Sequence, residues 1–258
     1  MTVVEMWTSF YTMLRKDVVR IFRIWPQTFL PSVITSVLYF LIFGKVLGER
    51  IGDIGGFSYI QFVVPGLVML AVVTNAFTNV ASTFFQSKFF SRNIDEILVS
   101  PTPPWVLIAG FVSGGVVRGT LTGIIVLLIS VFFAVPPLTN IFVIALFLIL
   151  SSVIFSLAGL INGIYAKSFD GITIFPTFVL TPLVYLGGVF YSANSLPGFW
   201  GTLTFANPIF YLVNGFRYGF MGISDVSLAV SIAVLLALIA ILVGFAWYLI
   251  RTGLGLRQ

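Results

Sequence analysis

The sequence offers few side chains that could do covalent chemistry. Its 258 residues include no histidine and no cysteine, which excludes Ser–His and Cys–His nucleophile pairs and leaves the carboxylates as the only strong metal ligands. The eight carboxylates are scattered, and the two pairs that are close in sequence, Glu49 with Asp53 and Asp95 with Glu96, fall in polar stretches. These residues argue against a hydrolase or a carboxylate metalloenzyme, and no metal site is expected.

A mixed-charge segment, residues 84–105, interrupts the apolar interior of the sequence. Its apolar residues follow a helical spacing, at Phe90, Ile94, Ile97 and Leu98. The charged residues lie off that stripe, at Lys88, Arg92, Asp95 and Glu96, with Asn93 among them. Ser100 precedes a proline, which ends the helix because that position is pushed out of the α region. A short amphipathic helix of this kind either contacts a soluble partner or simply joins two membrane spans.

A second polar feature is Arg118, near the middle of the apolar run 106–134. A charge inside a bilayer costs between about 2.5 and more than 10 kcal/mol, so Arg118 should face protein or water. It is either a packing or ion-pair residue or a direct participant in transport. The same run carries glycines at small-xxx-small spacing, for which close helix packing is the expected use. They are Gly110, Gly114, Gly115, Gly119 and Gly123.

Composition indicates that membrane helices position these residues. The chain is 59% hydrophobic and 8% charged, whereas a soluble domain carries about 25% charged residues. It is a polytopic membrane protein. The net charge of +5 does not indicate nucleic-acid binding, because the basic residues form no face or stripe. No early stretch resembles a cleaved signal peptide, so the spans themselves are expected to direct insertion.

We predict an all-α protein forming a single transmembrane domain over residues 1–258. Residues 2–25 are predicted to be a basic amphipathic helix lying in the membrane interface and ended by Pro26. Six spans of adequate length follow, at residues 29–47, 59–81, 106–134, 141–164, 172–190 and 226–250. The fifth contains Pro176 and Pro182 and should be kinked or partly unwound.

Residues 191–222 are rich in aromatic side chains, and Asn207-Pro208 breaks them into halves too short to span. We predict two short helices that dip into the membrane and return on the extracytoplasmic side. Trp200, Tyr211 and Tyr218 are expected at headgroup depth, and Arg217 is expected to snorkel outward.

The distribution of basic residues predicts that both termini are cytoplasmic. With six spans, the N-terminal segment, the central loop, Lys167 and the C-terminus lie on one side. The other side carries only Lys45, Arg50 and Arg217.

Several motifs are informative in combination. They are the N-terminal interfacial helix, the runs 92–101, 114–119 and 156–159, and the blocks 176–182, 187–192, 196–197, 207–208 and 215–218. Together they resemble the permease subunits of type-2 ABC exporters, a family that includes drug, polysaccharide and nodulation-factor export permeases. The resemblance covers essentially the whole chain, and the blocks from 176 to 208 are its most specific part.

The resemblance implies a homodimer in the bacterial inner membrane, working by alternating access with two copies of a cytoplasmic ATPase. The central loop would be the coupling helix between spans two and three, with the N-terminal helix beside it. The coupling residues would be Lys88, Arg92, Asn93, Asp95, Glu96, Leu98, Arg15 and Lys16. The re-entrant segment would form an exit region with Pro182, Gly188, Pro197, Asn207, Pro208 and Arg217. This chain has no phosphate-binding loop and needs no cofactor, so the ATPase would bind ATP and Mg.

Two other classes stay open. A secondary transporter usually carries intramembrane carboxylates, whereas the acids here lie in loops or at span ends. A channel-like membrane protein is not separated by residue types alone. Dependence on ATP and on a soluble partner distinguishes both from an exporter. Besides partner proteins, the chain contacts membrane lipid; its 28 phenylalanines suit an amphipathic cargo but equally suit ordinary lipid-facing surface.

Overall fold

Five helices of the structure are long and apolar enough to cross a membrane. The structure is a computed structural model that describes residues 1–90, 94, 96, 99–192 and 198–256, apart from the side chains at positions 45 and 49. The five are Trp25–Gly44, α4 (Tyr59–Phe89), α6 (Pro104–Ser130), α7 (Ile141–Tyr165) and α12 (Leu228–Thr252). A further apolar helix, Phe169–Tyr185, is shorter. The prediction of a polytopic, all-α membrane protein is confirmed.

The chain begins with α1 (Val3–Arg23), which a capping box starts. The Glu5 N–H donates to Thr2 Oγ1 at 3.3 Å, and the Thr2 N–H donates to Glu5 Oε2 at 2.9 Å. Ile24 alone separates α1 from α2 (Trp25–Leu41). The expectation that Pro26 ends the first helix is therefore wrong, because Pro26 lies in the first turn of α2, where its missing N–H is not needed.

The glycine-rich stretch after α2 contains a small hairpin that the sequence analysis did not anticipate. A π-helical turn, η1 (Ile42–Val46), and α3 (Gly48–Ile51) lead into β1 (Asp53–Ile54), which pairs antiparallel with β2 (Phe57–Ser58). Gly55 and Gly56 have φ of 61° and 84°, a conformation that glycine adopts readily in a two-residue turn.

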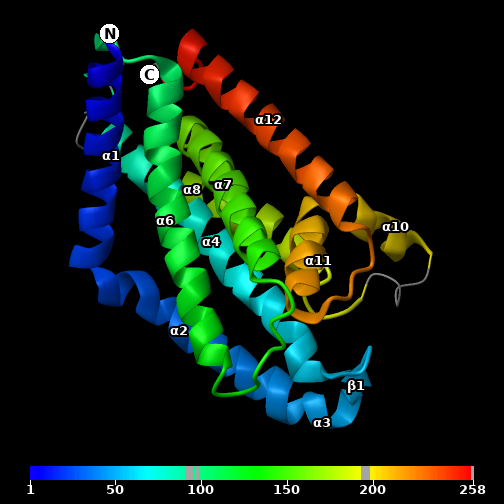
Figure 1. The fold of residues 1–258 in the computed structure, drawn as a ribbon. Coiled ribbons are helices and arrows are strands. Elements are labelled where there is room, and N and C mark those ends of the chain that lie inside the picture. Colours follow the sequence, from blue (N-terminus) through cyan, green and yellow to red (C-terminus); the bar gives the residue numbers. More distant parts are fainter. Residues whose placement is uncertain (91–93, 95, 97–98, 193–197, 257–258) are drawn as a thin grey trace.

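The centre of the bundle is α4, with 78% of its most apolar window buried. It packs against α6, α7 and α11, and side chains such as Phe77 and Val68 are fully buried in the larger apolar cluster. In Figure 1, α4 passes behind α6 and α7. It is longer than the predicted span 59–81, because its helix continues through Phe89 into the segment expected to be the central loop.

The predicted fifth span is a broken helix. It consists of α8 (Phe169–Phe175), the π-helical η2 (Pro176–Leu180) and α9 (Thr181–Tyr185). Proline cannot donate a helical hydrogen bond, and the π-helical turn starts at Pro176. The partial unwinding expected there is present.

After a turn at Gly188, which has φ of 74°, the chain forms α10 (Phe199–Phe205) and α11 (Pro208–Met221). Ala206 and Asn207 separate them, and Asn207 caps α11, since its Oδ1 accepts from the Ile209 N–H at 3.0 Å. Pro197 lies outside the described residues.

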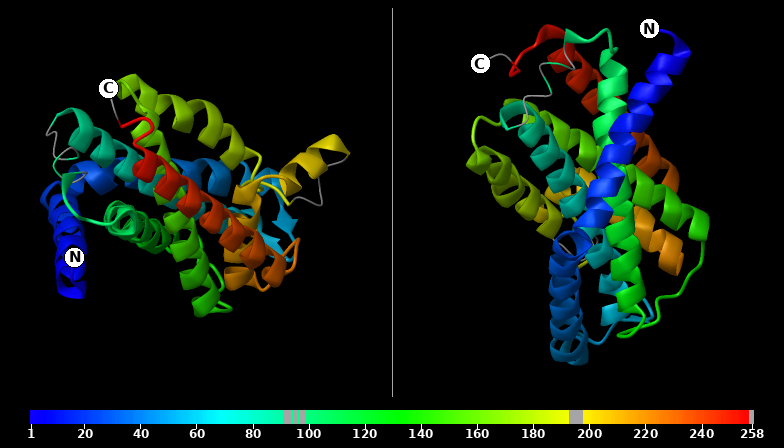
Figure 2. Two further views of the ribbon diagram at one scale, coloured as in Figure 1. Left: turned by 90° about the horizontal axis from the view of Figure 1, so that it is seen from above. Right: turned by 90° about the vertical axis from the view of Figure 1, so that its left-hand side faces the viewer.

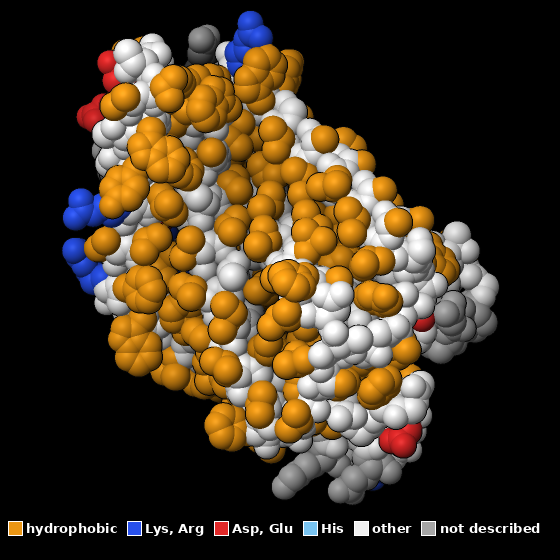
Figure 3. Space-filling view, in the orientation of Figure 1, with side chains coloured by type: hydrophobic (Ala, Val, Ile, Leu, Met, Phe, Trp, Pro, Cys, Tyr) orange, Lys and Arg blue, Asp and Glu red, His pale blue; other side chains and the backbone are white. Residues whose placement is uncertain are grey.

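Both termini lie at one end of the bundle, and the β1–β2 hairpin lies toward the other (Figure 1). Viewed from the side, α1 crosses α6 before the chain turns into α2 (Figure 2). The middle of the face drawn in Figure 3 is covered mainly by hydrophobic side chains, whereas the visible charged side chains lie at its edges. This distribution suits a protein embedded in lipid.

Candidate functional site

The central segment differs in part from the amphipathic helix that its spacing predicts. Phe90, at the C-cap of α4, is 76% exposed, whereas Ile94 is 2% exposed and packs in the smaller apolar cluster with Phe84 and Leu107. Phe90 and Ile94 therefore do not share one buried stripe. Glu96 is exposed. The other predicted coupling residues of this segment, Arg92, Asn93, Asp95 and Leu98, lie outside the described residues.

Lys88 does not face solvent as its position off the apolar stripe suggested. Its side chain is buried, and Nζ donates to the carbonyl oxygens of Ile164 at 3.0 Å and Gly255 at 2.5 Å. These carbonyls belong to the last turn of α7 and to the turn after α12. Lys88 lies in the last turn of α4, so its ammonium group links the end of α4 to the end of α7 and to the turn after α12.

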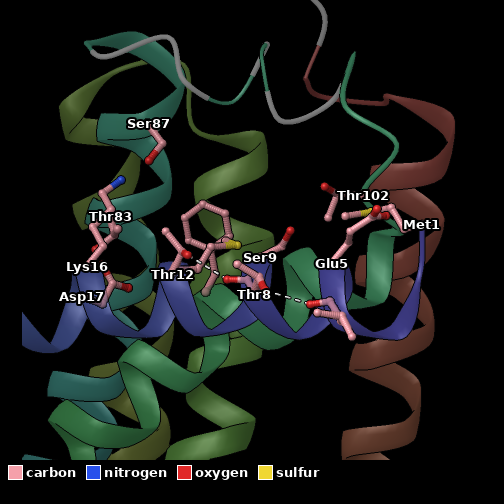
Figure 4. Close-up of a pocket in the computed structure, with 13 residues that line it drawn as sticks. Met1, Glu5, Thr8, Ser9, Thr12, Lys16, Asp17, Thr83, Ser87 and Thr102 are labelled. Atoms are coloured by element: carbon pink, nitrogen blue, oxygen red, sulfur yellow. Dashed lines mark hydrogen bonds between the residues drawn. The ribbon is translucent and has the colours of Figure 1, made fainter.

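A cavity of about 590 Å³ lies between α1 and the last turns of α4. In Figure 4, α1 runs along one side of the cavity with Glu5, Thr8 and Thr12, and Ser87 and Thr102 lie across from it. Thr8 and Thr12 already donate to backbone carbonyls of α1, at 2.8 and 2.7 Å. The predicted coupling residues Arg15 and Lys16 are exposed, and Lys16 lines this cavity.

The glycines of α6 face three different helices. A Cβ at Gly110 would lie 2.6 Å from Met13 Sδ, and one at Gly114 would overlap the Asp17 carboxylate, so both glycines face α1. Gly115 and Gly119 face side chains of both α4 and α7, including Ser156 and Ser152. Gly123 faces Leu148 of α7 and Val72 of α4. Each position lets a neighbouring helix approach α6 more closely than any side chain would allow.

A chain of polar contacts, which we call the α1–Arg118 network, joins α1 to the interior of the bundle. Arg20 Nη2 lies 3.6 Å from Asp17 Oδ1 and donates to Thr83 Oγ1 at 2.5 Å and to Asn79 Oδ1 at 3.1 Å. Arg118 Nη1 donates to the same Asn79 oxygen at 3.5 Å. Asn79 on α4 is thus the acceptor that two cationic side chains share, one from α1 and one from α6.

Burial dominates the electrostatics of Asp17. Its side chain is buried against α6, and this burial raises the pKa of the carboxyl group above its ordinary value, although the neighbouring cations Arg20 and Lys16 act in the opposite direction. The ion pair with Arg20 therefore only partly compensates the removal of the carboxylate from water.

Arg118 also lines a groove of about 420 Å³, which we call the Arg118 groove. The polar side chains of the groove come from α2, α4, α6 and α9. They are Gln27, Thr28, Ser32, Thr35, Ser36, Tyr39, Thr74, Asn75, Thr78, Arg118, Thr181 and Tyr185. Asn75 Nδ2 donates to Ser32 Oγ at 2.8 Å, which links α4 to α2 along the groove. Thr35, Thr74 and Thr78 are exposed on this single chain.

Arg217 does not snorkel outward, so that expectation is wrong. Its side chain is 3% exposed, its guanidinium lies 3.8 Å from the centre of the Phe62 ring, and Nη2 donates to the Gly188 carbonyl at 2.7 Å. A planar cation can stack on a buried ring, whereas snorkelling needs an open route to the surface that α11 does not provide here. Asn207 Nδ2 likewise donates to the Leu183 carbonyl at 2.5 Å, next to Pro182. The predicted exit residues Pro182, Gly188, Asn207, Pro208 and Arg217 therefore lie along one packed junction of α9 with α11.

The polar residues Asn75, Asn79 and Thr83 of α4 were not among the predicted functional residues. They recur every four residues, so they form one polar line along an otherwise apolar helix. That spacing was a readable signal. It indicated only that the line needed polar neighbours, and not that Arg20 and Arg118 would supply them.

Comparisons with known proteins agree with this architecture. A family model described as ABC-2 type transporter matches residues 8–221. The chain is 54% identical over 252 residues to "Inner membrane transport permease YadH" of Escherichia coli strain K12, and the match covers 98% of each protein.

More distant relatives include two nodulation proteins. "Nodulation protein J" of Rhizobium meliloti is 22% identical over 198 residues, covering 75% of each protein. "Nodulation protein J" of Neorhizobium galegae is 20% identical over 209 residues, covering 80% of this chain and 79% of the relative.

Proposed function

The chain belongs to the ABC-2 type transporter family and is a membrane transport subunit of the permease type, and we propose that it forms the translocation path of an ATP-driven exporter in a bacterial inner membrane. Two copies of the chain would enclose the path. Two copies of a separate cytoplasmic ATPase would bind ATP and Mg and drive the path between inward-open and outward-open states.

The observation that carries this proposal is the position of the α1–Arg118 network. One end of the network is on α1, at Asp17 and Arg20, and the other end is Arg118 in the Arg118 groove. A shift of α1 relative to α4 would break or remake the Arg20 bonds to Asn79 and Thr83, and so change the environment of Arg118. An ATPase acting on α1 and the central segment could thereby alter the groove.

The groove also supports the proposed dimer. Hydroxyl and amide side chains with a nearby guanidinium group do not lie against hydrocarbon without a large free-energy penalty. Since Thr35, Thr74 and Thr78 are exposed on the single chain, a second copy placed over this side would remove them from lipid and close a polar path between the two subunits.

The arrangement of helix ends supports the proposed sidedness. Counting Phe169–Tyr185 as a crossing gives six spans, which fits termini at one end of the bundle (Figure 1). Lys88 also joins the ends of α4 and α7 to the turn after α12 at that end. We assign this end to the cytoplasm because, with six spans, the segments on the side of the termini carry most of the basic residues of the sequence. Cysteines introduced singly at the exposed positions Val3 and Leu254 should both react with a maleimide only from the cytoplasmic side.

The test of the exporter function is purification of the chain from its native membrane in mild detergent, followed by identification of co-purifying proteins and assay of ATP hydrolysis. We expect a stoichiometric ATPase whose hydrolysis is uncoupled from transport by the double substitution Asp95→Ala and Glu96→Ala. The matched control removes the other close acid pair, Glu49→Ala with Asp53→Ala, which lies in the loop between the first two spans and should leave coupling intact.

Two results would contradict the proposal. One is recovery of the chain alone from every mild detergent, which would favour a channel or a secondary transporter. The other is normal export by the Asp95 and Glu96 double variant at wild-type abundance, which would remove the central segment from the coupling mechanism.

A further inference from the structure

We propose that the Arg118 groove binds the anionic head of an amphiphilic molecule, one carrying a phosphate, sulfate or carboxylate group. The inference rests on the proposed function, since it names the chemical class of molecule that would enter the translocation path. It is drawn from the charge of the groove, from the unused donors of Arg118 and from the polar lining.

The charge of the groove is one-sided. Among the described residues that line the groove, Arg118 is the one cation, and none is an aspartate or a glutamate. In the part of the chain that the structure describes, the ion pair within 4.0 Å is Arg20 with Asp17, and no carboxylate pairs with Arg118. A half-buried guanidinium without a counter-ion is a strong recognition element for an anion, because an anion supplies the missing compensation.

The donors of Arg118 are also largely unused. A guanidinium has five N–H donors. In the described structure Arg118 makes one long hydrogen bond, 3.5 Å to Asn79 Oδ1, and its buried Nε has no partner. The Asn79 oxygen is engaged more closely by Arg20, at 3.1 Å. Arg118 therefore retains the fork of donors with which arginine binds phosphate and carboxylate groups.

The remaining lining suits the rest of such a molecule. Ser32, Thr35, Thr74 and Thr78 supply hydroxyl groups, and Leu67 and Leu70 supply apolar surface beside them. The volume of about 420 Å³ lies within the usual range for small-molecule sites and is large enough for a head group with the start of an alkyl chain. An amphiphile would place its anionic group at Arg118 and its chain against the apolar side.

The test is calorimetric titration of the purified chain, held in phosphatidylcholine nanodiscs, with dodecyl phosphate, after subtraction of titrations into empty nanodiscs. Dodecyl maltoside, which has the same alkyl chain and no charge, is the comparison ligand. We expect dodecyl phosphate to bind at least tenfold more tightly than dodecyl maltoside. We expect Arg118→Gln to abolish that preference, because a charge-assisted hydrogen bond is worth about a factor of ten or more. Arg251→Gln is the control, because Arg251 lies in the last turn of α12, where its guanidinium stacks over the Trp247 ring. This variant should bind dodecyl phosphate as tightly as the wild type does.

A second variant keeps the proposal falsifiable if Arg118→Gln does not fold. Asn79→Asp places a carboxylate between Arg20 and Arg118. It loses no hydrogen bond of Nδ2, since that atom has no partner among the residues that the structure describes. The variant should unfold at the same or a higher temperature than the wild type and still bind dodecyl phosphate at least tenfold more weakly, because Arg118 then has an internal counter-ion.

The outcomes separate the alternatives. Equal binding of dodecyl phosphate and dodecyl maltoside, or wild-type binding by a folded Arg118→Gln or Asn79→Asp variant, overturns the proposal. Competition by phosphatidylglycerol added to the nanodiscs supports it and identifies bilayer lipid as the source of the anion. Undiminished binding in those nanodiscs supports it and assigns the groove to molecules other than resident lipid. No ATPase is needed, so failure of the exporter model would not alter this result.

Discussion

Gly159 lets α7 pack close to the backbone of α4, and its replacement by alanine tests this helix packing directly. A Cβ at this position of α7 would overlap the Phe77 carbonyl oxygen and lie 3.1 Å from its carbon and 3.2 Å from its Cα. These atoms are backbone atoms of α4, so no side-chain rotation relieves the contact. Alanine at position 159 would therefore force α4 and α7 apart.

The expected magnitude follows from two opposing effects. Overpacking a tight interior costs about 1–3 kcal/mol, whereas alanine in place of a helical glycine returns up to about 1 kcal/mol. We expect Gly159→Ala to lower the free energy of unfolding by about 1–2 kcal/mol. Gly244→Ala is the matched control, because Gly244 lies within α12 and a Cβ there meets nothing within 4 Å. It should leave stability unchanged or raise it by up to about 1 kcal/mol.

Thermal unfolding of both variants in the same detergent, followed by tryptophan fluorescence, measures this difference. For a chain of this size each kcal/mol corresponds to about 2–4 °C, so a stability difference of about 1–3 kcal/mol should separate the two midpoints by about 2 °C or more. Equal midpoints, or a Gly159→Ala variant more stable than Gly244→Ala, would refute the close backbone contact between α4 and α7.

Three further substitutions test individual side chains by the same unfolding measurement. Lys88→Met removes two buried hydrogen bonds to carbonyl oxygens and should lower the free energy of unfolding by about 2–4 kcal/mol. Transport per folded molecule should stay unchanged. ATP hydrolysis uncoupled from transport would instead show that Lys88 has a coupling role. Arg217→Lys keeps the charge but loses planar stacking on Phe62, so a loss of about 1–2 kcal/mol is expected, and a neutral effect would contradict the stacking. Burial raises the pKa of the Asp17 carboxyl group, so the protonated group contributes to folding stability near pH 4, and this contribution falls as the pH rises through the folded-state pKa. Asp17→Asn should remove this part of the pH dependence of the unfolding free energy. A variant with the same pH dependence as the wild type would exclude a stabilising role for the buried carboxyl group.

The membrane class and the order of the helices could be predicted from sequence because they depend on local properties. A run of apolar residues predicts a span whatever surrounds it, and a proline perturbs a helix through its own missing N–H. The breaks at Pro176 and Asn207 were therefore readable, as was the glycine spacing of α6. The hairpin at Gly55 and Gly56 also has a local signal, because two adjacent glycines favour a two-residue turn.

The tertiary structure alone decided what the charged side chains face. Lys88 and Arg217 looked like surface cations by type and position, yet both are buried, since other segments present carbonyl oxygens and a ring to them. The partners are distant in sequence: Lys88 and Gly255 are 167 positions apart, and Arg20 and Asn79 are 59 apart. The sequence determined that Arg118 needs a polar environment. Only the packing of α1, α2 and α4 around it decided that this environment is one shared amide oxygen and a hydroxyl-lined groove, because such contacts depend on how helices cross and not on the residues of any one helix.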